Sequence, residues 1–354
     1  MWPDDRLQTL FGIDHPIIQA PMAGASTPAM AAAVANAGGL GSLGCAMMSA
    51  DDLRAAAGEV AGATNRAVNF NFFCHQEPDI AAYDPAPMQR ALAPYYSEYG
   101  VGAPPAPTPG APSFNDETLA LLLSLAPKVV SFHFGLPKPE AIAALKHAGV
   151  TLMGCATNVA EARALEAAGI DAIVAQGAEA GGHRGAFIGA PHQNDMGTMA
   201  LVPQIVDAVS VPVIAAGGIF DGRGIAAAMM LGAAGAQLGT AFLRAPECMI
   251  SPLHKAALAQ APDNATTLTR LFSGRPARSI RNRVTDELAA LENDAAPFPS
   301  QRGLIAPLTK AATTQGRADF SPLWSGQAGP RAREAPSAEI FSTLCEEALA
   351  LLSR

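Results

Sequence analysis

Charged residues are scarce in this chain of 354 residues, because Lys, Arg, Asp and Glu together make up only 15% of it. Soluble domains usually contain about 25%. The balance is acidic, with 23 Lys and Arg against 31 Asp and Glu, and the formal net charge is −8. Proteins bind nucleic acids chiefly through clustered basic side chains, so we expect no nucleic-acid partner.

Cysteine is also sparse, and no two of the five cysteines form a CxxC pair. This spacing argues against a zinc ribbon and against a thiol redox motif. An odd, dispersed set is typical of reduced thiols, so we expect a cytoplasmic protein. Residues 1–6 contain no basic segment before an apolar run, so we expect no secretory signal.

Long apolar runs of the kind that span membranes are absent as well. Residues 15–50 and 224–243 carry no charge, but Gly, Asn, Gln or Pro interrupt both stretches. Each stretch is better explained as a helix followed by a short strand, so we expect no membrane partner.

Short apolar segments that alternate with Ala-rich segments dominate the chain instead. The predicted strands are residues 17–21, 40–43, 67–71, 129–132, 151–153, 172–175, 213–216 and 236–238, and the predicted helices are 28–37, 50–61, 115–125, 139–148, 159–168, 200–208 and 224–231. Capping residues such as Thr27, Asn158 and Asp221 precede several of these helices. Strict alternation indicates a parallel sheet, and eight units favour a closed TIM (β/α)8 barrel. A doubly wound open sheet is the structural alternative.

Two segments interrupt this alternation. Residues 76–115 hold nine prolines and all four tyrosines, and we predict a long loop there, at the catalytic end of the barrel. Residues 247–323 are more charged, and we predict a small, mostly helical second domain that covers the substrate. The chain is therefore divided into a barrel (1–246, with the Pro-rich insertion 76–115), this second domain (247–323) and a C-terminal segment that closes the barrel (324–354).

Glycine-rich turns follow the seventh and eighth predicted strands, at Gly217-Gly218 and Gly239-Thr240. In barrels the loops after these two strands often bind phosphate, because glycine lets an anion approach the backbone N–H groups. Ordinary tight turns are the alternative. Residues 39–44 match the spacing GxGxxG, but they follow a helix and overlap a strand, which is the reverse of the dinucleotide-binding order.

Two histidines follow predicted strands at the same end of the barrel. His183 lies in the Gly-rich segment 176–185, and an imidazole there is suited to exchange protons near neutral pH. His133 ends the fourth strand, where a structural role among aromatic residues is an equally good explanation. His192 and Asp195 lie near His183 in the sequence, but no paired spacing such as HExxH supports a metal site, and we expect none.

Polar and sulfur-containing side chains end two further strands. Asn69 and Asn71 end the third strand, and their amides are suited to contact a ring or a hydroxylated chain. Met22 follows the first strand, where its apolar side chain suits a flat heteroaromatic ring. Ordinary strand-to-helix turns would also explain both sites.

Together these motifs resemble the nitronate monooxygenase family, formerly called 2-nitropropane dioxygenase, and its class I branch in particular. The resemblance rests on residues 20–24, on Ser-Phe-His-Phe-Gly at 131–135, on 176–185, and on the two glycine turns. It extends in order from about residue 12 to residue 247.

The resemblance implies an FMN-binding TIM barrel that oxidises alkyl nitronates, such as propionate 3-nitronate, with O2 to carbonyl compounds and nitrite or nitrate, without a metal. It implies that His183 is the catalytic histidine, a base toward neutral nitroalkanes and a group that holds the anion of a nitronate, and that His133 contacts the substrate. The implied FMN contacts are Met22, Asn71, Gln176, Gly181, Gly217, Gly218, Gln237, Leu238, Gly239 and Thr240, with Asn69 as a competitor for Asn71. Residues 154–157 match no pattern that assigns them a role.

Two other functions remain open from the sequence. One is an FMN-dependent NAD(P)H:quinone or enoyl-thioester reductase, which would share the fold and the flavin site. The other is a flavin-free barrel that binds a sugar phosphate as a lyase or isomerase, because phosphate-binding loops alone are compatible with it.

Overall fold

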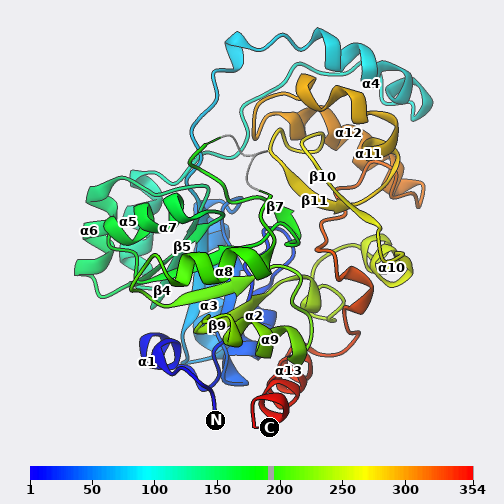
Figure 1. Cartoon of the computed structure of the whole chain (residues 1–354). Coiled ribbons are helices and arrows are strands. Elements are labelled where there is room, and N and C mark those ends of the chain that lie inside the picture. The colour runs from blue at the N-terminus through cyan, green and yellow to red at the C-terminus, as the bar shows by residue number, and fades with distance from the viewer. Residues whose placement is uncertain (190–194, 354) are drawn as a thin grey trace.

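The structure is a computed structural model that describes residues 1–189 and 195–353. Its centre is a sheet of eight parallel strands in the order β1-β9-β8-β6-β5-β4-β3-β2 (Figure 1). The strands are β1 (Ile17–Gln19), β2 (Gly41–Gly44), β3 (Val68–Phe73), β4 (Val129–His133), β5 (Thr151–Ala156), β6 (Ala172–Gln176), β8 (Val213–Ala216) and β9 (Gly235–Leu238). A parallel bridge between Ile18 and Leu40 joins the two edges, so the sheet curves into a nearly closed barrel. The predicted fold class is confirmed.

The strands are buried on both faces, as their continuous apolar sequences require. Inward-facing side chains from several strands form one cluster in the barrel, among them Ile18, Val129, Met153, Val174 and Ile214. The helix α1 (Arg6–Phe11) adds Leu7 and Phe11 to this cluster, so it covers one end of the barrel. This end of the barrel is therefore closed, and the other end, where the strands finish, is left for a site.

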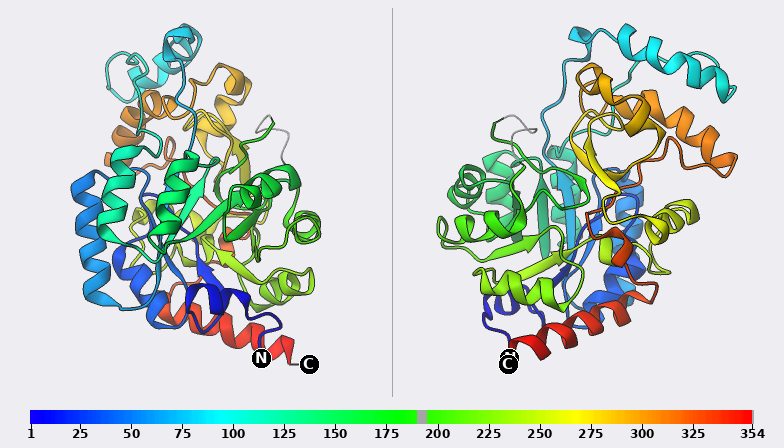
Figure 2. Two further views of the ribbon diagram at one scale, coloured as in Figure 1. Left: turned by 90° about the vertical axis from the view of Figure 1, so that its left-hand side faces the viewer. Right: turned by 45° about the vertical axis from the view of Figure 1, so that its right-hand side comes forward.

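Helices surround the sheet, and each predicted helix is observed within two residues of its predicted ends. They are α2 (Pro28–Asn36), α3 (Ala50–Ala63), α5 (Asp116–Leu125), α6 (Pro139–His147), α7 (Val159–Ala167), α8 (Thr198–Val206) and α9 (Gly222–Met230). The predicted caps are present, since the Thr27 side chain accepts from Met30 N and the Asn158 side chain accepts from Glu161 N. The C-terminal helix α13 (Ser337–Leu352) packs against α9 and α2, and both chain ends lie at the same end of the molecule (Figure 2).

The second domain lies over the carboxyl ends of the strands (Figure 1). Its helices are α10 (Pro252–Gln260), α11 (Arg283–Glu287) and α12 (Gln301–Thr314), with short 3-10 turns such as η4 (Ala289–Asp294). It also contains a three-stranded antiparallel sheet that the sequence did not predict, in the order β10 (Thr266–Thr269), β11 (Ala277–Ile280) and β7 (Gly182–His183). Because β7 comes from the loop after β6, this small sheet joins the barrel to the second domain.

The expectation of a long loop at residues 76–115 was wrong in part, because this segment contains the 13-residue helix α4 (Ala86–Glu98). Pro87 lies at the start of the helix, where a missing N–H is tolerated. Met88, Leu92 and Tyr96 recur at helical spacing and are buried in one hydrophobic cluster with side chains of α12 and η4. Packing against the second domain thus overrides the low helix propensity of a proline-rich sequence.

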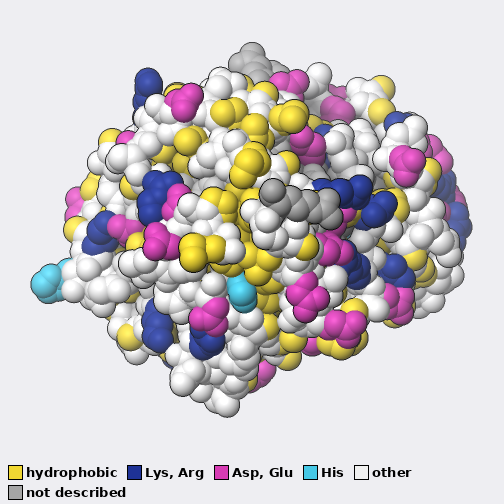
Figure 3. All heavy atoms as spheres, turned by 60° about the horizontal axis from the view of Figure 1, so that its bottom comes forward, with side chains coloured by type: hydrophobic (Ala, Val, Ile, Leu, Met, Phe, Trp, Pro, Cys, Tyr) yellow, Lys and Arg dark blue, Asp and Glu magenta, His cyan; other side chains and the backbone are white. Residues whose placement is uncertain are grey.

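The domain boundaries 1–246, 247–323 and 324–354 stay a prediction. Within residues 1–189 and 195–353, no helix combines the length and the apolarity needed to cross a membrane. On the face nearest the chain ends, Lys and Arg lie among Asp and Glu and do not gather into one basic patch (Figure 3).

Candidate active site

A cavity of about 730 Å³ lies at the carboxyl ends of the barrel strands, beneath the second domain. Of the residues named from the sequence, those that line it are Met22, Asn71, His133, Gln176, Gly181, His183, Gly217, Gly218, Gln237, Gly239 and Thr240. Leu238 does not line the cavity. Successive side chains of a strand point to opposite faces, so Gln237 borders the cavity while Leu238 packs in the hydrophobic cluster that contains Phe341 of α13.

Asn71 rather than Asn69 reaches the cavity. The Asn71 amide donates to Ser131 Oγ at 2.8 Å, and both residues border the cavity. Asn69 lies deeper in the barrel, where it donates to Ser42 Oγ at 3.1 Å. The Gln237 side chain makes no hydrogen bond within the described part of the chain, so its amide is available to a ligand.

The two glycine turns form one end of the cavity. Gly217 and Gly218 have φ values of 117° and 69°, which only glycine adopts without strain. Thr240 Oγ1 accepts from the N–H of Gly326 at 2.9 Å, so the threonine O–H remains free to donate. A Cβ on Gly181 would lie 2.5 Å from Gly326 N, and glycine there lets the 325–326 segment approach. The N–H groups of Gly218 and Thr240 make no backbone hydrogen bond with another described residue.

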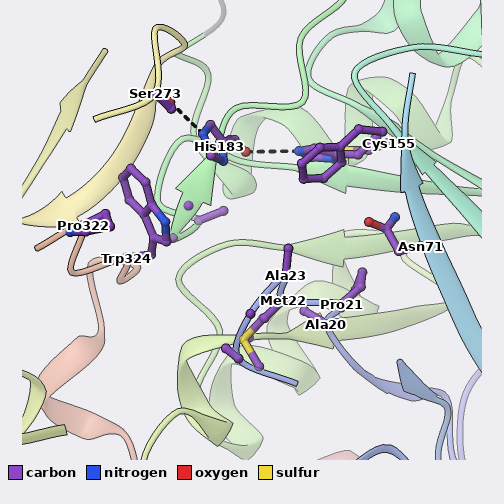
Figure 4. Close-up of a pocket in the computed structure, with 18 of the residues that line it drawn as sticks. Ala20, Pro21, Met22, Ala23, Asn71, Cys155, His183, Ser273, Pro322 and Trp324 are labelled. Carbon is purple, nitrogen blue, oxygen red and sulfur yellow. Dashed lines mark hydrogen bonds between the residues drawn. The ribbon is translucent and has the colours of Figure 1, made fainter. Parts of the chain in front are cut away.

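His183 lies between the barrel and the second domain. It pairs with Ala277 of β11, and its Nε2 lies 2.8 Å from Ser273 Oγ. Figure 4 shows Ser273 of the second domain and Trp324 of the C-terminal segment approaching His183, while Met22 comes from the turn after β1 and Asn71 from β3. Nδ1 of His183 makes no hydrogen bond to another described residue, so it is available to a substrate.

The surroundings of the His183 ring are aromatic. The ring centroids of Trp324, Phe298 and Phe134 lie 5.2, 5.4 and 5.7 Å from it. Burial, followed by the nearby basic groups of His133 and Arg275, lowers the pKa of His183 to about 3. The imidazole is therefore neutral near pH 7, and one of its ring nitrogens carries a free lone pair.

His133 holds the backbone of His183. Its Nε2 lies 3.2 Å from the His183 carbonyl oxygen, and a carbonyl only accepts, so this nitrogen carries the hydrogen. Burial lowers the pKa of His133 to about 4, so its ring is neutral near pH 7. Nδ1 of His133 therefore carries no hydrogen, and it can only accept a hydrogen bond from a substrate.

Gln176 holds the same loop. Its Nε2 donates to the His183 carbonyl at 3.0 Å, and its Oε1 accepts from Gly185 N at 2.8 Å. The guanidinium of Arg184, only 1% exposed, donates to the carbonyls of Gln176 and Gly177 at 2.9 and 2.6 Å. The sequence analysis does not assign a role to Arg184. Its position directly after His183 is the one feature of the sequence that indicates a role at the site.

Residues 154–157, which had no assigned role, lie at the end of β5 and also support the His183 segment. Glu161 Oε2 accepts from Thr157 N at 2.6 Å, and Glu161 Oε1 accepts from Phe187 N at 2.6 Å. Cys155 borders the cavity, and a Cβ on Gly185 would lie 2.6 Å from its Sγ. Glycine at 185 therefore allows the loop to pack against β5.

Among the described residues that line the cavity, Arg302 is the one side chain with a permanent charge. Among the lining residues that the structure describes there is no Asp, Glu or Lys, whereas Arg302 and four histidines are present. Within the described residues no group of three or more His, Cys, Asp or Glu is arranged to hold a metal ion. His192 lies outside the described residues, and Asp195 is exposed.

Sequence reasoning missed the site residues that come from beyond the barrel segment 1–246, above all Ser273, Phe298, Arg302 and Trp324. They lie 90 residues or more beyond His183 in segments without a recognisable motif. They reach the cavity only through the tertiary fold of the chain.

Comparisons with known proteins identify similar sequences and structures. A model of the family described as nitronate monooxygenase matches residues 4–347. The nitronate monooxygenase of Paraburkholderia phytofirmans is 45% identical over 344 residues, which cover 96% of this chain and 94% of that protein. The solved structure of nitroalkane oxidase from Streptomyces ansochromogenes is 40% identical with a TM-score of 0.89, over 98% of this chain and 99% of that one. FabK from Thermotoga maritima is 29% identical with a TM-score of 0.76, over 98% and 97% of the two chains.

Proposed function

The chain belongs to the nitronate monooxygenase family, and from this premise we propose that it is an FMN-dependent enzyme that oxidises alkyl nitronates with O2. The products are a carbonyl compound and nitrite or nitrate, and propionate 3-nitronate is a representative substrate. The observation that carries the proposal is the neutral His183, which faces a cavity without acidic side chains at the carboxyl ends of the barrel strands.

The residues present fit FMN. The cavity of about 730 Å³ lies in the range of pockets that enclose ligands of this size, roughly 300–1,000 Å³. Gly218, Gly239 and Thr240 would hold the phosphate through backbone N–H groups and the free threonine O–H. A Cβ on Gly239 would lie 3.6 Å from Met22 Sδ, so Met22 lies beside the same turn. Asn71 and Gln237 would supply amides to the remaining polar atoms of the cofactor.

When bound, the flavin supplies a ring that can take an electron from the nitronate before O2 reacts. The work of the chain is to bind the anion, to orient it and to move a proton. Leu238 and Gln176 were also named as cofactor contacts, and these assignments stay predictions, although the Gln176 amide is engaged by the His183 loop.

Ser273 allows His183 to act in two ways. The serine hydroxyl has two acceptors within reach, His183 Nε2 at 2.8 Å and the Arg275 carbonyl at 3.2 Å. When the O–H donates to Arg275, Ser273 Oγ accepts from His183 Nε2–H, and Nδ1 carries a lone pair that can take the α-proton of a neutral nitroalkane. When the O–H donates to His183 Nε2, Nδ1 carries the hydrogen and donates to an oxygen of the nitronate.

The second domain and the start of the C-terminal segment complete the site. Phe298 and Trp324 surround His183 with apolar surface, which keeps water away from the reacting atoms and strengthens the hydrogen bonds to the anion. We assign residues 1–246 to FMN binding, 247–323 to covering the substrate and 324–354 to closing the barrel. We also propose a cytoplasmic location, to which the five free cysteines are suited.

The test is anaerobic reduction of the flavin in the purified protein, by propionate 3-nitronate and by NADH in parallel. We expect the extracted flavin to be FMN and the nitronate to reduce it faster than NADH does. Fast reduction by NADH without reduction by the nitronate would indicate a reductase instead. A colourless protein would favour the flavin-free lyase or isomerase.

A further inference from the structure

One arginine at the cavity has no acidic partner. Arg302 lies in the first turn of α12 and borders the cavity together with Gly303 of the same turn. Within the described residues its guanidinium contacts Met47 Sδ at 2.6 Å and forms no ion pair. That contact is a hydrogen bond from Nη1, so the remaining N–H donors of the guanidinium are available to a ligand that reaches this side of the cavity.

The other arginine close to His183 is not available in this way. Arg275 donates to the carbonyls of Arg184 and Ala186 and lies 4.2 Å over the ring of Phe134. Arg275 does not line the cavity, so its guanidinium affects the site through its electrostatic field and not through direct contact with a ligand. Arg302 is thus the permanent charge that borders the cavity within the described residues.

The surroundings of Arg302 favour an anion. The positive end of the α12 dipole lies at the same turn, because the helix begins at Gln301 and its N-cap residue makes no side-chain cap. The neighbouring wall comes from the Pro-rich segment, since a Cβ on Gly303 would lie 3.4 Å from Thr108 Oγ1. No carboxylate of the described lining competes for the guanidinium, although the whole chain has a net charge of −8.

Unmet hydrogen-bonding capacity lies on the same side of the cavity. His75 borders the cavity, and its side chain is 2% exposed. Neither ring nitrogen has a hydrogen-bond partner, although Nε2 lies 3.8 Å from a carboxylate oxygen of the exposed Glu77. Its ring stands at 89° to that of Phe298, with the centroids 5.0 Å apart, and Phe298 comes four residues before Arg302. Buried polar atoms are rarely left unpaired, so this wall is suited to a polar ligand group.

We propose that Arg302 is a specificity-determining residue, which binds a carboxylate carried by the substrate at the end remote from its nitronate group. This inference rests on the proposed function, because it takes the nitronate end to lie at His183. A planar guanidinium matches a carboxylate with two parallel hydrogen bonds, which an ammonium does not reproduce. The preferred substrates are then nitronates with two negative charges, and nitronates with an apolar end bind less tightly.

Two substrates of equal shape test this assignment. Propionate 3-nitronate carries the carboxylate, and the nitronate of 1-nitro-3-methylbutane has an isopropyl group in its place. We would measure KM and kcat for both with the wild-type protein, Arg302→Gln and Arg302→Lys, each with verified flavin content. Lys310→Gln is the matched control, because Lys310 is an exposed cation of the same helix that does not border the cavity.

We expect Arg302→Gln to raise KM for propionate 3-nitronate about tenfold, with kcat nearly unchanged. This effect lies between those of an exposed and of a buried charged pair, because Arg302 is at the cavity mouth. KM for the isopropyl analogue should stay within twofold, Arg302→Lys should lie in between, and Lys310→Gln should match the wild type. Equal changes for the two substrates, or no change in Arg302→Gln, would overturn the assignment.

Equilibrium binding separates this assignment from the proposed function. Calorimetric titration with 3-nitropropionate and with 1-nitro-3-methylbutane reports the carboxylate contact even in a protein that turns over neither nitronate. Loss of the preference for 3-nitropropionate in Arg302→Gln supports the assignment regardless of turnover. Absence of such a preference in the wild-type protein contradicts it.

Discussion

Removal of the Ser273 hydroxyl should affect the two forms of a substrate unequally. When His183 takes a proton from a neutral nitroalkane, it becomes an imidazolium whose Nε2–H is donated to Ser273 Oγ, 2.8 Å away. A hydrogen bond to a charged group contributes about 1.5–3 kcal/mol, so Ser273→Ala should lower kcat/KM for nitroethane by roughly ten- to hundredfold. With ethyl nitronate no imidazolium forms, and a neutral hydrogen bond of about 1 kcal/mol corresponds to a loss of roughly fivefold.

The assay is steady-state oxygen consumption with nitroethane and with ethyl nitronate, on proteins of equal flavin content. Ser279→Ala is the matched control, because Ser279 is a fully buried serine of β11 whose hydroxyl donates to the Ile280 carbonyl at 3.0 Å. It should lower both activities equally, if at all. Equal losses for the two substrates in Ser273→Ala would refute the pairing of Ser273 with a protonated His183.

Three further results are expected. Gly218→Asp should yield mostly colourless protein, because it adds a carboxylate where the FMN phosphate binds and a side chain at a φ of 69°; full flavin occupancy in this variant, measured by absorbance, would place the phosphate elsewhere. His75→Phe should raise the free energy of unfolding of the flavin-free protein by about 1–3 kcal/mol, because both ring nitrogens are buried without a hydrogen bond and the Glu77 carboxylate is 3.8 Å away; a lower denaturation midpoint would contradict this. Stability should fall as the pH drops from about 6.5 toward 4, because the buried His183, His133 and His254 have folded-state pKa values of about 3, 4 and 4 and each binds its proton more tightly when unfolded; a melting temperature that stays constant over this range would show that the imidazoles are not held neutral.

Most of the barrel was predictable because its pattern is local. Each strand is a short apolar run next to an Ala-rich helix, and residues 213–216 coincide with the observed β8. The helix α4 was not predictable, because its prolines lower helix propensity and only contacts with the second domain compensate for them. The strand β7 has two residues and exists only through its pairing with β11, so no local pattern marks it.

The candidate site was predictable where it follows the strands. The residues at strand ends meet in one cavity because parallel strands finish at the same side of a barrel. Successive residues of β9 point to opposite faces, so Gln237 borders the cavity and Leu238 does not. A sequence motif that treats the two residues alike does not reveal this difference. Ser273 and Arg302 depend on contacts across about a hundred residues, and their roles required the folded chain.

The proposed function depends on His183, which lies in the cavity at the carboxyl ends of the strands. The role of His183 is decided by the turnover of His183→Asn, with verified FMN content, on a nitronate and on the corresponding neutral nitroalkane. Asparagine keeps a hydrogen-bond donor but cannot accept a proton near neutral pH. We expect retained FMN, weakened turnover of the nitronate, and a loss of about 10²–10⁴-fold for the neutral nitroalkane. Turnover of both forms at the wild-type rate would show that His183 is structural and would contradict the account.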